Sequence, residues 1–383
     1  MAPLPPIPPV PPVPPMPPMA APDAHDAGTY ERELARFERN MNRFERDLER
    51  EMESHARAVE EHGRAVERSH RNGPRPPALM TIVQARDEVL YERSFDFRAG
   101  DELVVGLSSE DVVIETGPGS GASVRVVGRG AGAREEFERR RFDARYAGGE
   151  LRVRTDPPRG PSLRRNRAEF TVTIRIPEQA QVDVSTASGD VRMARVGGDL
   201  AEVSTASGNI SLATVRADRI SLSAASGDIA AGALEGDVRV STSSGNVTVD
   251  RIAGGSATLT ASSGDLRVDR MEASRFSARA ASGDIVVGGV TGAASATTSS
   301  GDVTIRFARS TATEVNTASG EVSLTFPRGA GADVQLSGPD VEIDGALSFD
   351  GSRQRRSVRG RLGAGGPDVT VSTASGDIAL SAR

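Results

Sequence analysis

The chain has 383 residues, with 41 glycines, 23 prolines, no cysteine, no tryptophan and only 4% aromatic residues. Because aromatic side chains supply much of the buried area of a large globular core, this composition favours thin layers of Val, Ile, Leu and Ala, as in repeat proteins. The lack of cysteine excludes disulfides and thiolate metal sites, and the mild net charge of −6 argues against a nucleic-acid partner.

Residues 1–28 form a proline-rich arm with an apolar residue at every third position. Since polyproline II has three residues per turn, these side chains would line one edge of a stiff rod. The arm is predicted to be disordered or in polyproline II, as a spacer or as a ligand for a proline-binding groove. The apolar positions are Leu4, Ile7, Val10, Val13, Met16 and Met19.

Residues 29–71 are predicted to form one long, charged helix. Its apolar positions, from Tyr30 to Val66, follow each other by three or four residues, which is a heptad pattern with one stutter. We therefore expect a homo-oligomer through a coiled coil at 30–66. A helix folded back onto the β region and a single exposed helix are the alternatives. His55 and His62 lie on the seam, where they are predicted to set the register instead of binding a metal. Residues 72–78 are a proline-rich linker.

Residues 79–182 contain strand-like alternation, as at Leu103 and Val105, but with irregular spacing. We interpret this part as the opening coils of a β-solenoid with longer loops. No window approaches the roughly 18 apolar residues of a membrane span, so no transmembrane segment is expected. No secretory signal is visible, so export would require a start upstream of Met1.

Residues 183–383 repeat a Ser-Gly-Asp turn every 18 or 19 residues. The turn glycines are Gly189, Gly208, Gly227, Gly245, Gly264, Gly283, Gly301, Gly320 and Gly376. They are followed by Asp190, Asn209, Asp228, Asn246, Asp265, Asp284, Asp302 and Asp377, and by a glutamate after Gly320. A degenerate copy lies at Gly338, and the stretch 345–366 between it and Gly376 is predicted to be one coil with an extruded loop.

A fixed period in this range predicts a solenoid, whose units bury their apolar faces only against each other. Each turn is followed by an apolar pair two residues apart, such as Ile285 and Val287, which is typical of a strand. We predict an all-β protein whose main body is a parallel β-solenoid, with two strands and two corners in each coil. Glycine suits the tight corner, and the Asp or Asn would cap the turn with its side chain.

The run V-S-T-A-S-G-D-[VI], together with the strand and proline at Thr171–Pro177, resembles a bacterial putative-adhesin β-strand repeat family of unknown function (LiaG-like, DUF4097-type). The resemblance covers most of residues 90–383. It implies a parallel β-helix or β-roll that is exported or bound to the cell envelope, and it implies no particular activity.

Catalytic groups are scarce in the predicted solenoid. The four histidines all precede it, at His25, His55, His62 and His70, and clustered carboxylates of the kind that glycosidases use are missing. We therefore expect no enzyme and no cofactor. The aspartates of the turns form one row, and a calcium-binding β-roll is the alternative to turn capping.

The predicted function is that of a non-catalytic, adhesin-like scaffold or binding protein of the cell envelope, with an envelope polymer or surface partner. A self-assembling scaffold in the cytoplasm, similar to the bactofilins, is the alternative. One predicted loop is rich in arginine and is a candidate site for an anionic polymer. Its arginines are Arg353, Arg355, Arg356, Arg359 and Arg361.

Overall fold

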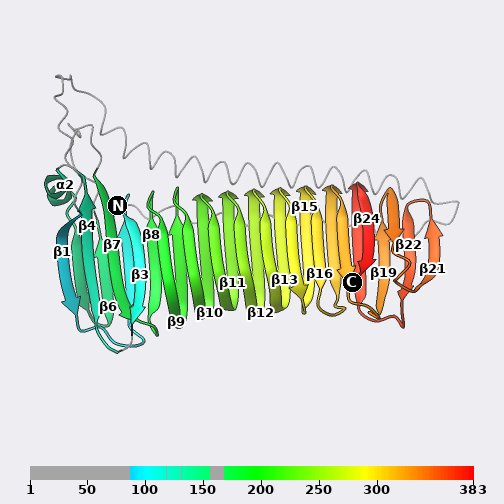
Figure 1. Ribbon diagram of the computed structural model, residues 1–383, viewed down its shortest axis with the longest axis horizontal. Coiled ribbons are helices and arrows are strands. Elements are labelled where there is room, and N and C mark those ends of the chain that lie inside the picture. The colour runs from blue at the N-terminus through cyan, green and yellow to red at the C-terminus, as the bar shows by residue number, and fades with distance from the viewer. Residues whose placement is uncertain (1–86, 118, 131, 156–167) are drawn as a thin grey trace, which may run out of the picture. The chain divides into compact units, whose positions relative to one another are not determined.

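A computed structural model describes residues 87–117, 119–130, 132–155 and 168–383. The predicted proline arm, heptad helix and linker lie outside these residues. The described residues divide into two compact units, 87–235 and 236–383, and both consist of stacked strands (Figure 1). Within the described part, no helix is both long enough and apolar enough to cross a membrane.

Parallel pairing at an offset of one period builds both units. In the first, β10 (Ile210–Ser226) lies beside β9 (Val191–Thr205), with Ile210 opposite Val191. In the second, β12 (Val247–Ser263) pairs with β13 (Leu266–Ser282) in the same way. Each coil therefore rests on the coil one repeat earlier, and the prediction of an all-β, solenoid-like fold is confirmed for the described residues.

The predicted coil of two strands and two corners is wrong in detail. In β12 the strand continues through the coil, but the pairing with β13 skips Asp250 and Gly255. The inward side chains also change spacing there, because Val249, Ile252 and Ala257 follow one another at steps of three and five. These two interruptions act as corners, so each coil has three short segments and a third corner at the Ser-Gly turn.

The interior of each coil is a thin aliphatic layer. Val247, Ile252 and Leu259 are fully buried, and buried apolar side chains lie beside them at the equivalent positions of the next coil. Burial of one such side chain contributes about 1.5–3 kcal/mol. The second unit also contains a stacked pair of rings, Phe307 and Phe326, whose centroids are 4.8 Å apart.

The first unit orders its coils differently from the sequence. Strands β2 and β3 lie between two later pairs of strands, because β2 pairs with both β6 and β8 while β3 pairs with both β7 and β9. The chain thus passes over the coil of β2 and β3 on its way from β7 to β8. The bounds are β2 (Glu102–Leu107), β3 (Asp111–Gly117), β6 (Glu150–Arg154), β7 (Glu169–Pro177) and β8 (Gln181–Thr186).

Antiparallel strands pair with the outermost coil of the first unit. Strand β4 (Ala122–Arg129) pairs with β7 and with β1 (Glu88–Phe95), while β5 (Asp143–Ala147) pairs with β6. The short helix α2 (Ala133–Arg139) carries Phe137, which packs near the buried Phe170. The predicted irregular opening region therefore consists of two coils and a cap.

The second unit contains a similar inserted coil among its last strands. The last strands of the sequence, β23 and β24, lie between the pair β17 and β18 on one side and the pair β19 and β20 on the other. The bounds of its remaining coil strands are β14 (Ile285–Val290), β15 (Ala293–Ser300), β16 (Val303–Phe307), β17 (Thr313–Ser319), β18 (Val322–Phe326), β19 (Ala332–Ser337), β20 (Asp340–Ile343), β23 (Asp368–Ser375) and β24 (Asp377–Ala382). Strand β11 (Ile229–Ser244) connects the two units along the chain.

The prediction that residues 345–366 form a coil with an extruded loop is wrong. Strands β21 (Phe349–Gln354) and β22 (Ser357–Leu362) form an antiparallel hairpin that pairs with β19. The preserved spacing between Gly338 and Gly376 was therefore misleading, since Gly376 stacks on Gly320.

The predicted turn glycines form a column in each unit. A Cβ on Gly283 would overlap the carbonyl oxygen of Gly264, and Gly283 has a φ of +147°, which L side chains rarely adopt. The same overlap with the preceding glycine occurs at Gly264, Gly301, Gly320 and Gly376 in the second unit and at Gly208 and Gly227 in the first. Glycine is required because the backbones of neighbouring coils touch there.

Replacement of one column glycine tests this contact. We expect Gly283→Ala to lower the free energy of unfolding by about 2–4 kcal/mol, through backbone strain and overpacking. The matched control is Gly345→Ala, where an added Cβ has no neighbour within 4 Å and φ is not positive. Thermal unfolding followed by circular dichroism would measure both variants, and equal melting temperatures would contradict the column.

Candidate functional site

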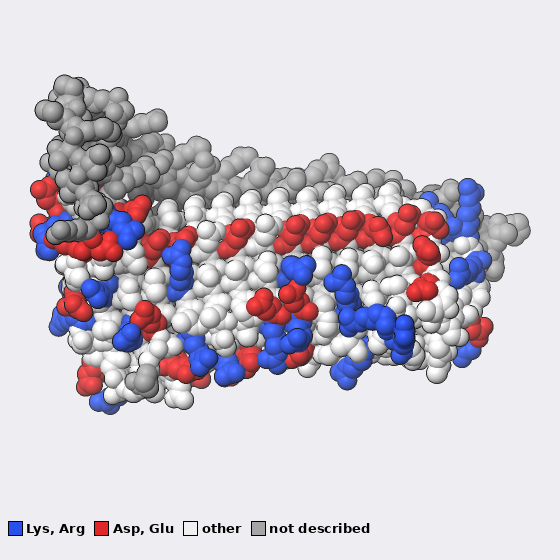
Figure 2. Space-filling model, in the orientation of Figure 1, with Lys and Arg blue, Asp and Glu red and all other residues white. Residues whose placement is uncertain are grey.

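The row of turn carboxylates is bonded from coil to coil in the second unit. The backbone N–H of Asp284 donates to Oδ1 of Asp265 at 2.9 Å, and that of Asp265 donates to Oδ1 of Asn246 at 3.0 Å. The N–H groups of Asp302 and Glu321 continue the series, each at 2.8 Å from the preceding Oδ1. Figure 2 shows acidic side chains in a row along this unit.

The first unit contains the same ladder with one additional member. The N–H groups of Asp190, Asn209 and Asp228 donate to Oδ1 of Asp111, Asp190 and Asn209, each at 3.0 Å. Asp111 was not predicted, because Glu110 occupies the place of the turn glycine. The available signal was an aspartate directly before the apolar run Val112–Ile114.

The ladder uses its side chains as backbone caps. Asn209 and Asn246 accept the same bond as the aspartates, so the ladder requires an acceptor oxygen and not a negative charge. The cap was predicted within each turn, but these bonds satisfy the N–H of the next coil. A typical hydrogen bond of this kind contributes about 1 kcal/mol to stability. It also fixes the position of each Oδ1 against the backbone of the next coil.

The last predicted member stands apart from this series. Asp377 lies beside Asp340 in the pairing of β20 with β24. Within the described ranges, no group of three or more His, Cys, Asp or Glu side chains is arranged to hold a metal ion.

A buried ion pair joins the residue after helix α2, Arg140, to Glu110 in the turn between β2 and β3. Oε1 of Glu110 lies 2.8 Å from the guanidinium of Arg140, and Oε2 accepts the N–H of Ser108 and the hydroxyl of Thr155. Burial raises the pKa of Glu110, but Arg140 and the donated hydrogen bonds lower that pKa by more, so it lies below its ordinary value. Both carboxylate oxygens of Glu110 are therefore occupied by contacts within the fold.

One carboxyl group has the opposite shift. The pKa of Asp183 is raised by partial burial and by the nearby charges of Glu202 and Glu102. A raised pKa is a feature of catalytic acids. However, Asp183 lines neither of two depressions on this unit that are candidate binding surfaces.

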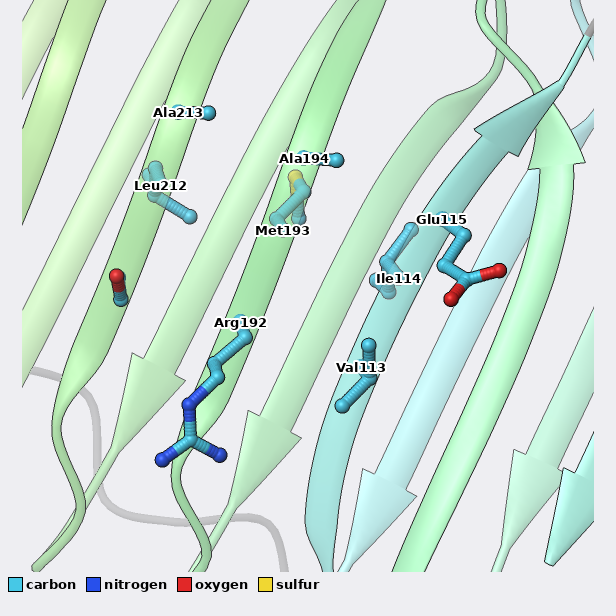
Figure 3. Close-up of a pocket in the computed structure, with 9 residues that line it drawn as sticks. Val113, Ile114, Glu115, Arg192, Met193, Ala194, Leu212 and Ala213 are labelled. Atoms are coloured by element: carbon cyan, nitrogen blue, oxygen red, sulfur yellow. The ribbon is translucent and has the colours of Figure 1, made fainter.

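These two depressions form one shallow groove over β3, β9 and β10. The first, with a volume of about 360 Å³, is lined by Val113, Met193 and Leu212, with Glu115 and Arg192 beside them (Figure 3). The second, of about 1030 Å³, shares Ala194 and Ala213 with the first. The wide opening and small side chains suit a polymer or protein surface better than an enclosed small molecule.

The charged side chains of the groove are mostly paired. Arg192 donates to Asp190 at 2.8 Å, and Arg216 lies 2.7 Å from Glu235. Arg195 has no partner within the described residues and leaves one free guanidinium at the groove. Ser211 is the one hydroxyl of the first depression. The arrangement can bind and orient a partner, but it contains no pair of nucleophile and base.

The predicted arginine loop lies in the cap hairpin of the second unit, where four of its five arginines have intramolecular contacts. These are Arg353 over the ring of Phe349 (5.2 Å), Arg356 to the carbonyl of Ala374 (3.0 Å), Arg359 to Oε1 of Gln335 (2.8 Å) and Arg361 to Oδ2 of Asp350 (3.4 Å). Such contacts orient the hairpin, so the loop is weaker as a binding site than the sequence indicated.

Solved structures resemble this chain at low identity. A "putative adhesin" from Parabacteroides distasonis is 11% identical, with 61% of this chain and 96% of that chain covered and a TM-score of 0.43. A "putative adhesin" from Parabacteroides merdae is 10% identical, with 61% and 95% covered and a TM-score of 0.40. A "putative lipid binding protein" from P. distasonis is 15% identical, with 76% and 96% covered and a TM-score of 0.35.

A comparison with curated proteins finds no match. The profile of the family described as Toastrack DUF4097 matches residues 101–235 and 233–381. The two matches divide the sequence near residue 235, at the same place as the boundary between the two compact units. They span most of the part that carries the turn ladder, and the chain belongs to the Toastrack DUF4097 family.

Proposed function

We propose that this chain is a non-catalytic, adhesin-like binding protein of the cell envelope, and that the groove over β3, β9 and β10 is its binding surface. The observation that carries the proposal is the groove itself, a wide depression on a stiff sheet with one free guanidinium, that of Arg195. A stiff sheet loses little conformational entropy on binding, which favours a preformed surface.

The use of the other polar groups supports the same proposal. Oxygens of the turn ladder accept backbone N–H groups, and Glu110 is held by Arg140. The histidines of the chain all precede the β region. The side chains best suited to proton transfer are therefore engaged in structure or lie elsewhere in the sequence. The proposed partner is an envelope polymer or surface component, so the proposed location is the cell envelope. A self-assembling scaffold in the cytoplasm is the competing assignment.

A groove-filling substitution tests the proposal. Full-length protein is mixed with insoluble bacterial envelope material, and the bound fraction is measured by sedimentation. We expect the wild type to cosediment without releasing sugar or peptide fragments. Ala213→Trp, which fills the groove, should weaken binding by about ten-fold, which corresponds to roughly 1.4 kcal/mol. Ala293→Trp, at an exposed alanine of β15 on the other unit, should bind like the wild type.

Two results would count against this role. Catalytic release of soluble fragments would indicate an enzyme. Equal binding by Ala213→Trp and the wild type would show that the groove is not the surface used. Cell fractionation decides the location, because recovery of all the protein in the cytoplasmic fraction would favour the scaffold.

We also propose that the heptad segment 30–66 assembles the chain into a homo-oligomer. The support is its apolar spacing of three and four residues, which is typical of a coiled coil. Sedimentation equilibrium of the full chain should give a multiple of 40.1 kDa. The double variant Leu34→Asp/Leu48→Asp should give the monomer mass, because charges on the seam disrupt helix pairing. A monomeric wild type would refute the assembly.

A further inference from the structure

Four exposed arginines gather on the second unit. They are Arg306, Arg309, Arg328 and Arg383. Figure 2 shows basic side chains together over the part of this unit near β16 and β24, apart from the acidic row. We call these four residues the arginine patch.

Coil stacking brings the patch together from distant parts of the sequence. Arg309 and Arg328 each follow a stacked phenylalanine, Phe307 or Phe326, by two residues. The N–H of Arg328 donates to the carbonyl of Arg383, and the N–H of Arg383 donates to the carbonyl of Phe326. The Arg383 guanidinium in turn reaches the carbonyl of Phe307 at 3.3 Å.

The guanidiniums of the patch pair with no carboxylate of a described side chain. Arg309 donates to the carbonyl of Thr291 at 2.7 Å, so this bond and that of Arg383 hold the side chains on neutral acceptors. Asp and Glu side chains of the described residues form ion pairs with other arginines but not with these four. Asp344, which lies near β24 through a bond from its N–H to the carbonyl of Leu380, accepts the N–H of Ala346 with its own Oδ1.

Other arginines of the same unit differ in this respect. Arg251 pairs with Glu272 at 2.7 Å, and Arg267 pairs with Asp269 at 2.9 Å. Four guanidiniums without a side-chain ion pair repel each other, and in a chain with a net charge of −6 they form a local reversal of sign. An oxyanion partner would relieve the repulsion, since guanidinium groups bind carboxylate, sulfate and phosphate through paired hydrogen bonds.

The neighbouring side chains favour a sugar over a nucleic acid. Arg306 lies beside Thr325, and Thr325 lies beside Ser381, whose hydroxyl donates to the Thr325 hydroxyl at 3.2 Å. These hydroxyls can exchange hydrogen bonds with sugar hydroxyls. Single-stranded nucleic acids instead need exposed aromatic rings for base stacking, and both Phe307 and Phe326 are fully buried.

We propose that the arginine patch binds a linear anionic glycan, with guanidiniums on its carboxylate or sulfate groups and the Thr325 and Ser381 hydroxyls on its sugar rings. Neighbouring coils repeat about every 4.8 Å, so the charges are presented in a row that suits a polymer of repeating anionic units. The inference builds on the proposed binding role but uses a surface on the other unit from the groove.

Binding to defined polymers tests the patch with the full chain. Polygalacturonate, dextran sulfate and neutral dextran of matched length serve as probes, with a thymidine oligonucleotide as a fourth. We expect Arg309→Gln/Arg328→Gln to weaken binding to the anionic glycans by about ten-fold and to reduce the salt dependence of that binding. The control Arg353→Gln/Arg355→Gln removes the same charge from the cap hairpin and should change affinity by less than about two-fold.

Specific outcomes would overturn the proposal. These are equal binding to neutral dextran, equal losses in the two double variants, or tighter binding of the oligonucleotide than of either glycan. Melting temperatures of both variants exclude unfolding as the cause of a loss. If Ala213→Trp loses envelope binding but keeps glycan binding, the groove and the arginine patch are two separate binding surfaces. If instead the glycans fail to bind while Ala213→Trp still matters, the groove survives and the patch does not.

Discussion

The parallel backbone ladder between coils one repeat apart is the interaction on which the remaining structure depends. It fixes the offset of 19 residues between β9 and β10 and between β12 and β13. That offset places like residues above one another, so glycine carbonyls meet the next glycine and each Asp or Asn oxygen meets the next backbone N–H. Buried aliphatic columns follow from the same register, which explains how the coils manage with few aromatic residues.

Each unit departs from sequence order at the end where a cap is built. An open parallel edge would expose unpaired backbone groups and invite aggregation. In the first unit, β4 and β5 pair antiparallel with the outermost coil, and in the second, β22 does so. The inserted coils of β2 with β3 and of β23 with β24 then have partners on both sides. The cap segments also hold many of the aromatic side chains, including Phe137, which packs near Phe170 of the outermost coil.

The sequence alone predicted the period, the parallel coils and the role of the turn glycines, because these follow from local spacing. It did not predict the third corner, which shows only as a change of spacing between inward residues such as Val249 and Ile252. The order of the terminal coils was also missed, since pairing between Ser319 and Ser375 leaves no mark in a periodic sequence. The arginine patch was missed for the same reason: Arg306 and Arg383 are 77 residues apart (383 − 306), and only the inserted last coil brings them together.

Crosslinking between engineered cysteines tests the coil order most directly, because the natural chain contains no cysteine. Ser319 and Ser375 are direct neighbours on β17 and β23, whereas Ser319 and Ser337 are separated by the strand between them. The second pair is separated by two coil spacings of about 4.8 Å each, and Ser337 also lies opposite Ser372, three residues before Ser375. Its Cα atoms are therefore more than about 9–10 Å apart, beyond the roughly 7 Å limit for a disulfide. The account predicts that Ser319→Cys/Ser375→Cys forms a disulfide and that Ser319→Cys/Ser337→Cys does not. Crosslinking of the second pair but not the first would contradict it.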